Sequence, residues 1–130
     1  MVAREWSFEA AEAVRALFEK RNYLSFLRAV CTPDSDYDAA VIVFIELVGN
    51  VVRHAAGPIR ISVRTNESGG AILQVTDTGA PFAIAPALPS NTSESGRGLY
   101  IVCRFCTEVT VTRNERGNVV RVRLPVEWNA

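Results

Sequence analysis

Hydrophobic and polar residues recur with a helical period between Val41 and Ala55, in the segment VIVFIELVGNVVRHA. When successive residues are placed 100° apart around a helix axis, the apolar residues form one broad stripe and a polar row lies opposite it. We expect the stripe to pack on a core and the polar row to face water or a site. The stripe contains Val41, Phe44, Ile45, Val48, Val51, Val52 and Ala55, and the polar row contains Glu46, Asn50, Arg53 and His54.

Two residues of this helix are unusual for a surface that only meets solvent. Asn50 is a poor residue for a helix interior because its amide competes with the backbone for hydrogen bonds. Gly49 costs about 1 kcal/mol of helix stability relative to alanine. Glu46 and Asn50 are one helical turn apart, so their side chains lie side by side. The row by itself leaves a solvated face and a functional face equally open.

The segment before this helix predicts one short strand and one helix. Apolar Trp6 and Phe8 alternate with polar neighbours, which is typical of a strand over residues 2–8. A helix is expected from Glu9 to about Cys31, because Pro33 prevents its continuation. Its aromatic residues fit either a core or a partner surface, and core packing is the simpler interpretation. The expected apolar contacts come from Val14, Leu17, Phe18, Leu24, Phe26, Leu27 and Val30.

The central helix is expected to begin near Asp34–Asp38, with Ser35 or Asp36 as its N-cap, and to stop at Ala56-Gly57-Pro58. Further strands follow, and their strict alternation indicates a sheet with one packed face and one wet face. We therefore predict one domain over residues 1–130. Its fold class is α+β: a two-layer α/β sandwich with a mixed, mainly antiparallel sheet covered on one face by about three helices. The later strands are expected at 59–64, 71–77, 109–112 and 120–126.

Composition narrows the class of protein. The chain has 130 residues, 48% of them hydrophobic, which is enough to form a stable core without disulfide bonds or structural metal ions. Its 14 basic and 14 acidic side chains cancel, which argues against nucleic-acid binding driven by bulk charge. The longest apolar run, 39–47, is too short to cross a bilayer, and the first residues lack an apolar signal core. We expect a cytoplasmic protein without direct nucleic-acid or membrane contact.

Two groups of residues receive structural interpretations. Cys31, Cys103 and Cys106 are expected to be buried thiols, because the single C-x-x-C has no second pair of metal ligands beside it. The basic residues near the C-terminus are expected to form the solvated face of the sheet. They are Arg113, Arg116, Arg121 and Arg123.

Two further segments carry candidate chemistry. Asp77-Thr78-Gly79 follows a strand, where an aspartate is either a turn former or a carboxylate aimed at a ligand amine. After a long loop, Gly96-Arg97-Gly98-Leu99 opens a helix that is expected to reach about Phe105. Free N–H groups at a helix start can hold phosphate, although a flexible hinge explains the two glycines equally well.

Together these motifs resemble the ATP-binding (Bergerat, GHKL) fold shared by DNA gyrase B, heat-shock chaperones, sensor histidine kinases and MutL. Within that group the chain is most similar to the small serine kinases that act as bacterial anti-sigma factors in partner-switching systems. The likeness extends roughly from Ser35 to Pro125. It rests on ELVGNVVRHA at 46–55, DTGAPF at 77–82 and GRGLYIV at 96–102.

The resemblance implies a role for each motif. Asn50 would ligate Mg²⁺ and Glu46 would act as general base on an attacking hydroxyl. Asp77 would accept the adenine amino proton, and Gly79 would let the base approach. The backbone N–H groups of the third motif would close over the phosphates of ATP, together with the Arg97 guanidinium. The residues of that motif are Gly96, Arg97, Gly98 and Leu99.

The implied function is that of a Mg-ATP-dependent protein serine/threonine kinase. Its expected substrate is a STAS-type anti-anti-sigma protein, and its output partner is a sigma factor or another regulator. A homodimer is also expected, since relatives commonly form one. The alternative is a nucleotide-gated binding module with little or no kinase activity. A histidine kinase is disfavoured because the only histidine, His54, lies inside the ATP motif. Asn118 stands where the family often has a threonine near the adenine.

Overall fold

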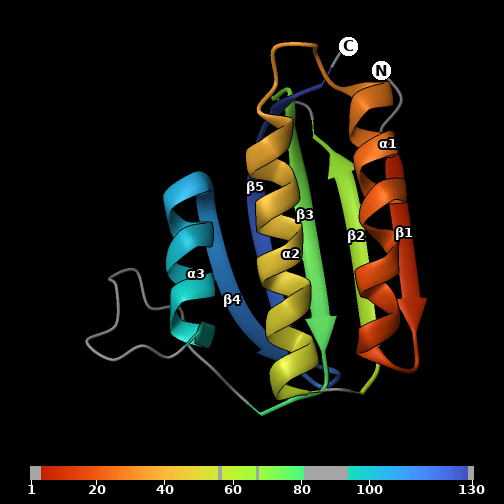
Figure 1. The fold of residues 1–130 in the computed structure, drawn as a ribbon, viewed down its shortest axis with the longest axis vertical. Coiled ribbons are helices and arrows are strands. Elements are labelled where there is room, and N and C mark those ends of the chain that lie inside the picture. The colour runs from red at the N-terminus through yellow and green to blue at the C-terminus, as the bar shows by residue number, and fades with distance from the viewer. Residues whose placement is uncertain (1–3, 56, 67, 81–93, 129–130) are drawn as a thin grey trace.

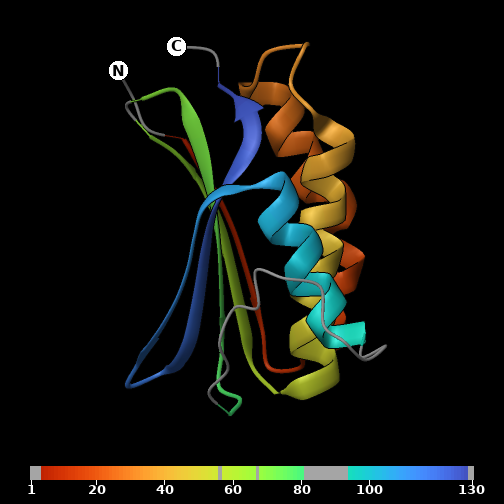
Figure 2. The ribbon, with the colours of Figure 1, turned by 90° about the vertical axis from the view of Figure 1, so that its left-hand side faces the viewer.

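The computed structural model describes residues 4–55, 57–66, 68–80 and 94–128. They form two layers: Figure 1 looks onto the helices with the sheet behind them, and Figure 2 shows the sheet and the helical layer edge on. The strands are β1 (Glu5–Ala10), β2 (Ile59–Thr65), β3 (Gly70–Asp77), β4 (Thr107–Asn114) and β5 (Gly117–Glu127). The helices are the 3₁₀ helix η1 (Ala13–Glu19), α1 (Lys20–Val30), α2 (Tyr37–His54) and α3 (Glu94–Phe105).

The sheet has the strand order β1-β2-β3-β5-β4, and every strand pair among the described residues is antiparallel. Burial alternates along β2 and β3, so one face of the sheet carries the core and the other carries polar side chains. All helices lie over the core face (Figure 2). The predicted α+β two-layer sandwich is therefore confirmed, with antiparallel pairing throughout the described strands.

The long helix α2 runs down the middle of the helical layer, between α1 and α3 (Figure 1). Of the two predicted caps, Ser35 and Asp36, the structure uses the second: the Asp36 carboxylate accepts a hydrogen bond from the Ala39 N–H at 3.0 Å. The buried arc of the helix is rotated from the predicted stripe. Val43 and Leu47 are buried, whereas Ile45 is 42% exposed. The rotation arises because helices flank α2 on both sides, and the sequence pattern of one helix does not reveal its neighbours.

The predicted helix from Glu9 is wrong over its first half. β1 continues through Ala10, which pairs with Ile59, and the next residues form η1 before α1 begins. A 3₁₀ helix repeats every three residues, so Ala13 and Ala16 share its inner face and are fully buried. The larger apolar residues of η1 point outward, contrary to their predicted core role. Val14 is 45% exposed, Leu17 40% and Phe18 81%.

The cysteines agree with the thiol interpretation. No disulfide forms among the three, all of which lie in the described part of the chain; Cys31 and Cys106 are buried as predicted, whereas Cys103 is only partly buried. Burial raises the pKa of Cys31 to about 11 and that of Cys106 to about 12, so both thiols stay protonated at neutral pH. The described residues contain no cluster of three potential metal ligands from His, Cys, Asp or Glu. Within the same residues, no helix has both the length and the apolar character to cross a membrane.

The core between α1 and α2 centres on two aromatic rings. The Tyr23 and Phe44 rings lie 4.5 Å apart between centroids, and the Tyr23 hydroxyl donates to the Ala40 carbonyl at 2.7 Å. Burial raises the pKa of the Tyr23 hydroxyl well above its ordinary value, so it remains a donor. This contact fixes α2 against α1 and so fixes the position of the polar residues further along α2.

Phe44→Ala is expected to lower the free energy of unfolding by about 3–5 kcal/mol, because it leaves a cavity in this core. Phe18→Ala is the matched control, since that ring is 81% exposed. The control is expected to change the free energy by less than about 0.5 kcal/mol. Urea denaturation of both variants measures the difference, and equal effects would contradict the described burial.

Candidate functional site

Three motifs that are far apart in the sequence meet at one end of the sandwich. Figure 1 shows that α2 ends, β3 ends and α3 begins at this same end. Asn50 lies near the end of α2, Asp77 is the last residue of β3, and 96–99 lie in the first turns of α3. The predicted helix to Phe105 is correct, but it starts at Glu94, so Gly96 and Gly98 lie within it and not in a preceding loop. The Arg97 and Leu99 side chains, and the predicted loop residues 81–93, fall outside the description.

Glu46 and Asn50 occupy one edge of the buried arc of α2. Asn50 is only 6% exposed and Glu46 is half-buried, so these two residues do not form a solvated face, whereas Arg53 and His54 of the predicted polar row are exposed. No hydrogen bond joins the Asn50 amide to another described residue, which leaves its oxygen available to a ligand. Gly49 lies between Glu46 and Asn50 in the sequence, and a Cβ at Gly49 would lie 3.2 Å from Arg53 Nη1. The glycine therefore gives the Arg53 side chain room to fold along the helix.

Asp77 is the buried carboxylate of the site. It is 3% exposed, and it lies on the face of the sheet that the helices cover. Its Oδ1 accepts hydrogen bonds from the Gly79 N–H at 2.7 Å and from Asn118 Nδ2 at 3.1 Å. Among the described residues no donor reaches Oδ2. One carboxylate oxygen is thus fixed by the protein, and the other is free to accept a hydrogen bond from a ligand.

Gly79 is needed for close packing between the turn after β3 and the end of α2. A Cβ at this position would lie 2.9 Å from the Ala55 Cβ and 3.0 Å from Asp77 Oδ1. Real Cβ atoms do not approach other atoms as closely as the first of these distances, and the second is unusually tight, so a side chain here would displace the turn or the carboxylate. The resemblance assigns Gly79 to the approach of the base, and the structure adds this contact with α2.

Three residues of the β4–β5 hairpin border Asp77 and Gly79 although none of them is among the predicted site residues, and of the three the resemblance pointed only to the position of Asn118. Asn118 is 1% exposed and lies directly opposite Asp77 in the β3–β5 register. Gly117 has φ +135°, and a Cβ there would collide with the Asp77 carbonyl oxygen. Arg113, predicted as part of a solvated face, donates from Nη1 to the Gly79 carbonyl at 2.9 Å. The signal in the sequence was the pair Gly117-Asn118, which departs from the family pattern.

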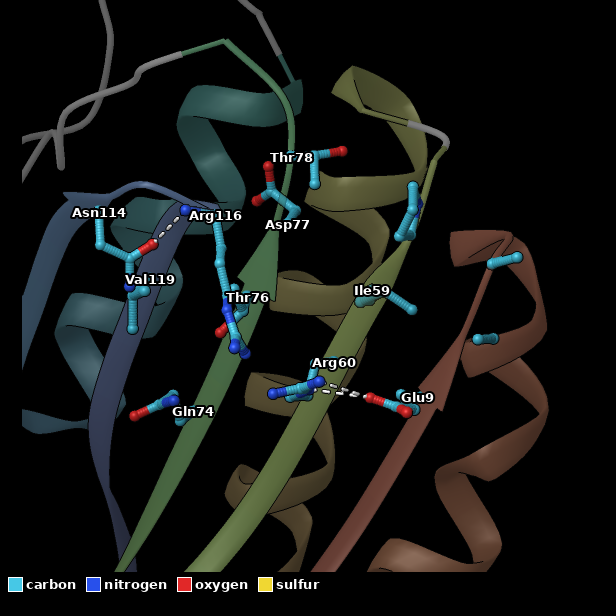
Figure 3. Close-up of a pocket in the computed structure, with 13 residues that line it drawn as sticks. Glu9, Ile59, Arg60, Gln74, Thr76, Asp77, Thr78, Asn114, Arg116 and Val119 are labelled. Atoms are coloured by element: carbon cyan, nitrogen blue, oxygen red, sulfur yellow. Dashed lines mark hydrogen bonds and ion pairs between the residues drawn. The ribbon is translucent and has the colours of Figure 1, made fainter.

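A separate cavity of about 600 Å³ lies on the open face of the sheet, away from the helices (Figure 3). Of the predicted site residues whose side chains the structure describes, Asp77 lines it and Glu46 and Asn50 do not. Arg60 there is paired with Glu9 at 2.9 Å, and Figure 3 shows Asp77 at the end of β3 beyond them. Glu46 and Asn50 on α2 therefore lie away from this cavity, on the helical side of the sheet.

Comparison with known proteins bears on the family and on the fold. The family model described as the histidine kinase-like ATPase domain matches residues 9–124. Among solved structures, the histidine kinase AdeS of Acinetobacter baumannii superposes with a TM-score of 0.54 at 16% sequence identity. The match covers 96% of this chain and 68% of that one, and at this identity it shows a shared fold alone. A search of curated proteins finds no match.

Gly79→Ala is expected to lower the free energy of unfolding by about 1–3 kcal/mol, because its methyl group collides with the Ala55 methyl group. Ala55→Gly in the same chain removes one of the two collisions and should recover part of this loss. Chemical denaturation of the two single variants and the double variant measures their interaction energy, expected to be at least about 0.5 kcal/mol in the favourable direction. Purely additive effects would show that the two residues are not in contact.

Proposed function

The chain belongs to the histidine kinase-like ATPase domain family, and we propose that it binds Mg-ATP at the end of the sandwich where α2, β3 and α3 meet. The observation that carries this proposal is the buried Asp77 carboxylate, whose Oδ1 is held by protein donors while Oδ2 has no donor among the described residues. The Asp77 carboxylate only accepts hydrogen bonds and is 3% exposed, so it can bind a buried donor such as the exocyclic amine of adenine. Asn50 is buried at the same end of the molecule, and its amide oxygen can coordinate a metal ion bound to the nucleotide.

The residues present fit a hard divalent cation and a phosphate chain. The Asn50 amide offers a neutral oxygen, which Mg²⁺ accepts as a ligand while keeping several waters and phosphate oxygens. Mg²⁺, when bound, neutralises charge on the phosphates during phosphoryl transfer. The backbone N–H groups at the start of α3 are suited to anions, because the first turn of a helix leaves them without partners.

We propose further that the chain is a protein serine/threonine kinase. Glu46 lies one helical turn from Asn50 and is half-buried, so it can take the proton of a substrate hydroxyl near the metal-bound phosphates. The likeness of the motifs at 46–55, 77–82 and 96–102 to anti-sigma-factor serine kinases supports a STAS-type anti-anti-sigma substrate. In that proposal the chain, as a homodimer, sequesters a sigma factor or another output protein until the substrate protein displaces it.

Calorimetric titration with ATP and ADP, with and without Mg²⁺, tests the nucleotide site. Asp77→Asn is expected to weaken binding about 10- to 100-fold, because it removes a charge-assisted hydrogen bond to the base amine. Glu9→Gln is the control: this carboxylate lines the cavity on the open face, and its loss should leave the affinity unchanged. If the wild-type protein bound no nucleotide, or if Glu9→Gln abolished binding, the proposed site would be wrong.

A phosphotransfer assay with [γ-³²P]ATP and a panel of STAS proteins tests the proposed reaction. Glu46→Gln should slow transfer about 10²- to 10⁴-fold, the usual contribution of a general base, while the Kd for ATP stays within a few-fold. Glu12→Gln, an exposed position outside the site, is the control.

If the wild-type chain transferred no phosphate, but nucleotide still controlled its binding to a partner, the alternative of a nucleotide-gated binding module would hold. A Glu46→Gln variant with wild-type transfer rates would exclude Glu46 as the base.

A further inference from the structure

Asn118 makes three contacts with the turn after β3. Its Nδ2 lies 3.1 Å from Asp77 Oδ1, 3.2 Å from the Gly79 carbonyl oxygen and 2.9 Å from the Ala80 carbonyl oxygen. The amide group has only two hydrogens, so these three acceptors use both of them. Asn118 therefore has no hydrogen left to donate to a ligand, unlike a threonine hydroxyl placed beside a base.

Arg113 fixes which way the Asn118 amide points. Its Nη1 donates to Asn118 Oδ1 at 3.2 Å and to the Gly79 carbonyl at 2.9 Å. Turning the amide over would place its oxygen against the Asp77 carboxylate and its NH₂ against the guanidinium, and both contacts would be repulsive. The guanidinium, which never loses its charge, thus holds Nδ2 toward Asp77.

Strand register aligns these three side chains. Asp77 pairs with Asn118 across β3 and β5, and Arg113 pairs with Asn118 across β5 and β4. The row therefore crosses three neighbouring strands at the end of the sheet where the site lies. Asn118 is 1% exposed in the middle of this row, while Arg113 is exposed at its outer end.

We propose that Arg113 and Asn118 are positioning residues that set the base selectivity of the site, an inference that rests on the proposed binding of ATP. Asn118 binds Asp77 Oδ1, so the carboxylate keeps one orientation and presents Oδ2 alone to the ligand. Both side chains act through Asp77 and through the turn carbonyls and do not touch the base. Loss of either should weaken the recognition of an exocyclic amine more than the recognition of the phosphates.

The test compares Kd values for Mg-ATP and Mg-ITP, because hypoxanthine carries a carbonyl oxygen where adenine carries the amine. The variants are Arg113→Met, Asn118→Leu and Asn118→Thr. The control is Arg116→Met, an exposed arginine of the same hairpin whose side chain makes no hydrogen bond with the described residues of the turn after β3. Arg113→Met changes an exposed side chain, so it tests the proposal even if Asn118→Leu does not fold.

Arg113→Met and Asn118→Leu are expected to raise the Kd for ATP about 10-fold, the usual size of one lost hydrogen bond to a charged group. The Kd for ITP should change less than about 3-fold, so the ATP:ITP preference falls. Asn118→Thr should retain part of the preference, because its hydroxyl can still donate to Asp77 Oδ1. Arg116→Met should leave both values unchanged. The ¹⁵N–¹H signal of Gly79 should shift in the first two variants without nucleotide, since its N–H shares Oδ1 with Asn118.

Two outcomes would overturn the inference. Unchanged Kd values for both nucleotides in folded Arg113→Met protein would show that the pair does not set selectivity, while ATP binding itself would stand. Equal losses for ATP and ITP would make the pair a merely structural support of the site. If the wild-type chain bound neither nucleotide, the proposed function would fail, and this inference would fail with it; that result is distinct from the other two.

Discussion

A buried carboxylate with one occupied oxygen determines how the rest of the site is built. A charged carboxylate that is only 3% exposed is unfavourable unless hydrogen bonds from the protein replace those from water. At Asp77 the Gly79 backbone N–H and the Asn118 side-chain amide donate these hydrogen bonds. No ion pair reaches this carboxylate within the described residues, so its charge remains available to a ligand. The turn after β3 supplies the backbone donor, and it requires a glycine at position 79 because a side chain there would collide with Ala55. β5 supplies the Asn118 amide, and it requires a glycine at position 117 because a side chain there would collide with the Asp77 carbonyl.

The position of α2 links this carboxylate to the proposed chemistry. The Tyr23–Phe44 contact and the flanking helices set the rotation of α2, and this rotation places Asn50 at the edge of the buried arc. The last turn of α2 then packs on Gly79 through Ala55. The proposed metal ligand and the proposed base acceptor are therefore held by one continuous set of contacts. A change in helix packing would alter the distance between them.

The sequence predicted the layers of the fold, the cap at Asp36 and the order of the motifs, because periodicity and capping are local properties. It failed where the outcome depends on neighbours that are distant in sequence. Phe18 was assigned to the core because a regular helix was assumed, whereas the 3₁₀ turn buries two alanines in its place. Arg113 is exposed as predicted, but its contacts with Asn118 and Gly79 were not predicted, because these partners come from another strand and a turn. No local pattern encodes that register.

The most direct test of the nucleotide site is a ¹⁵N–¹H spectrum of the protein titrated with Mg-ADP. Binding on the helical side of the sheet should shift the signals of the Gly79 amide and of the side-chain amides of Asn50 and Asn118, with little change at Gln74 on the open face. Shifts confined to Gln74, Arg60 and Arg116, which line the open-face cavity, would contradict the central claim that nucleotide binds on the helical side of the sheet.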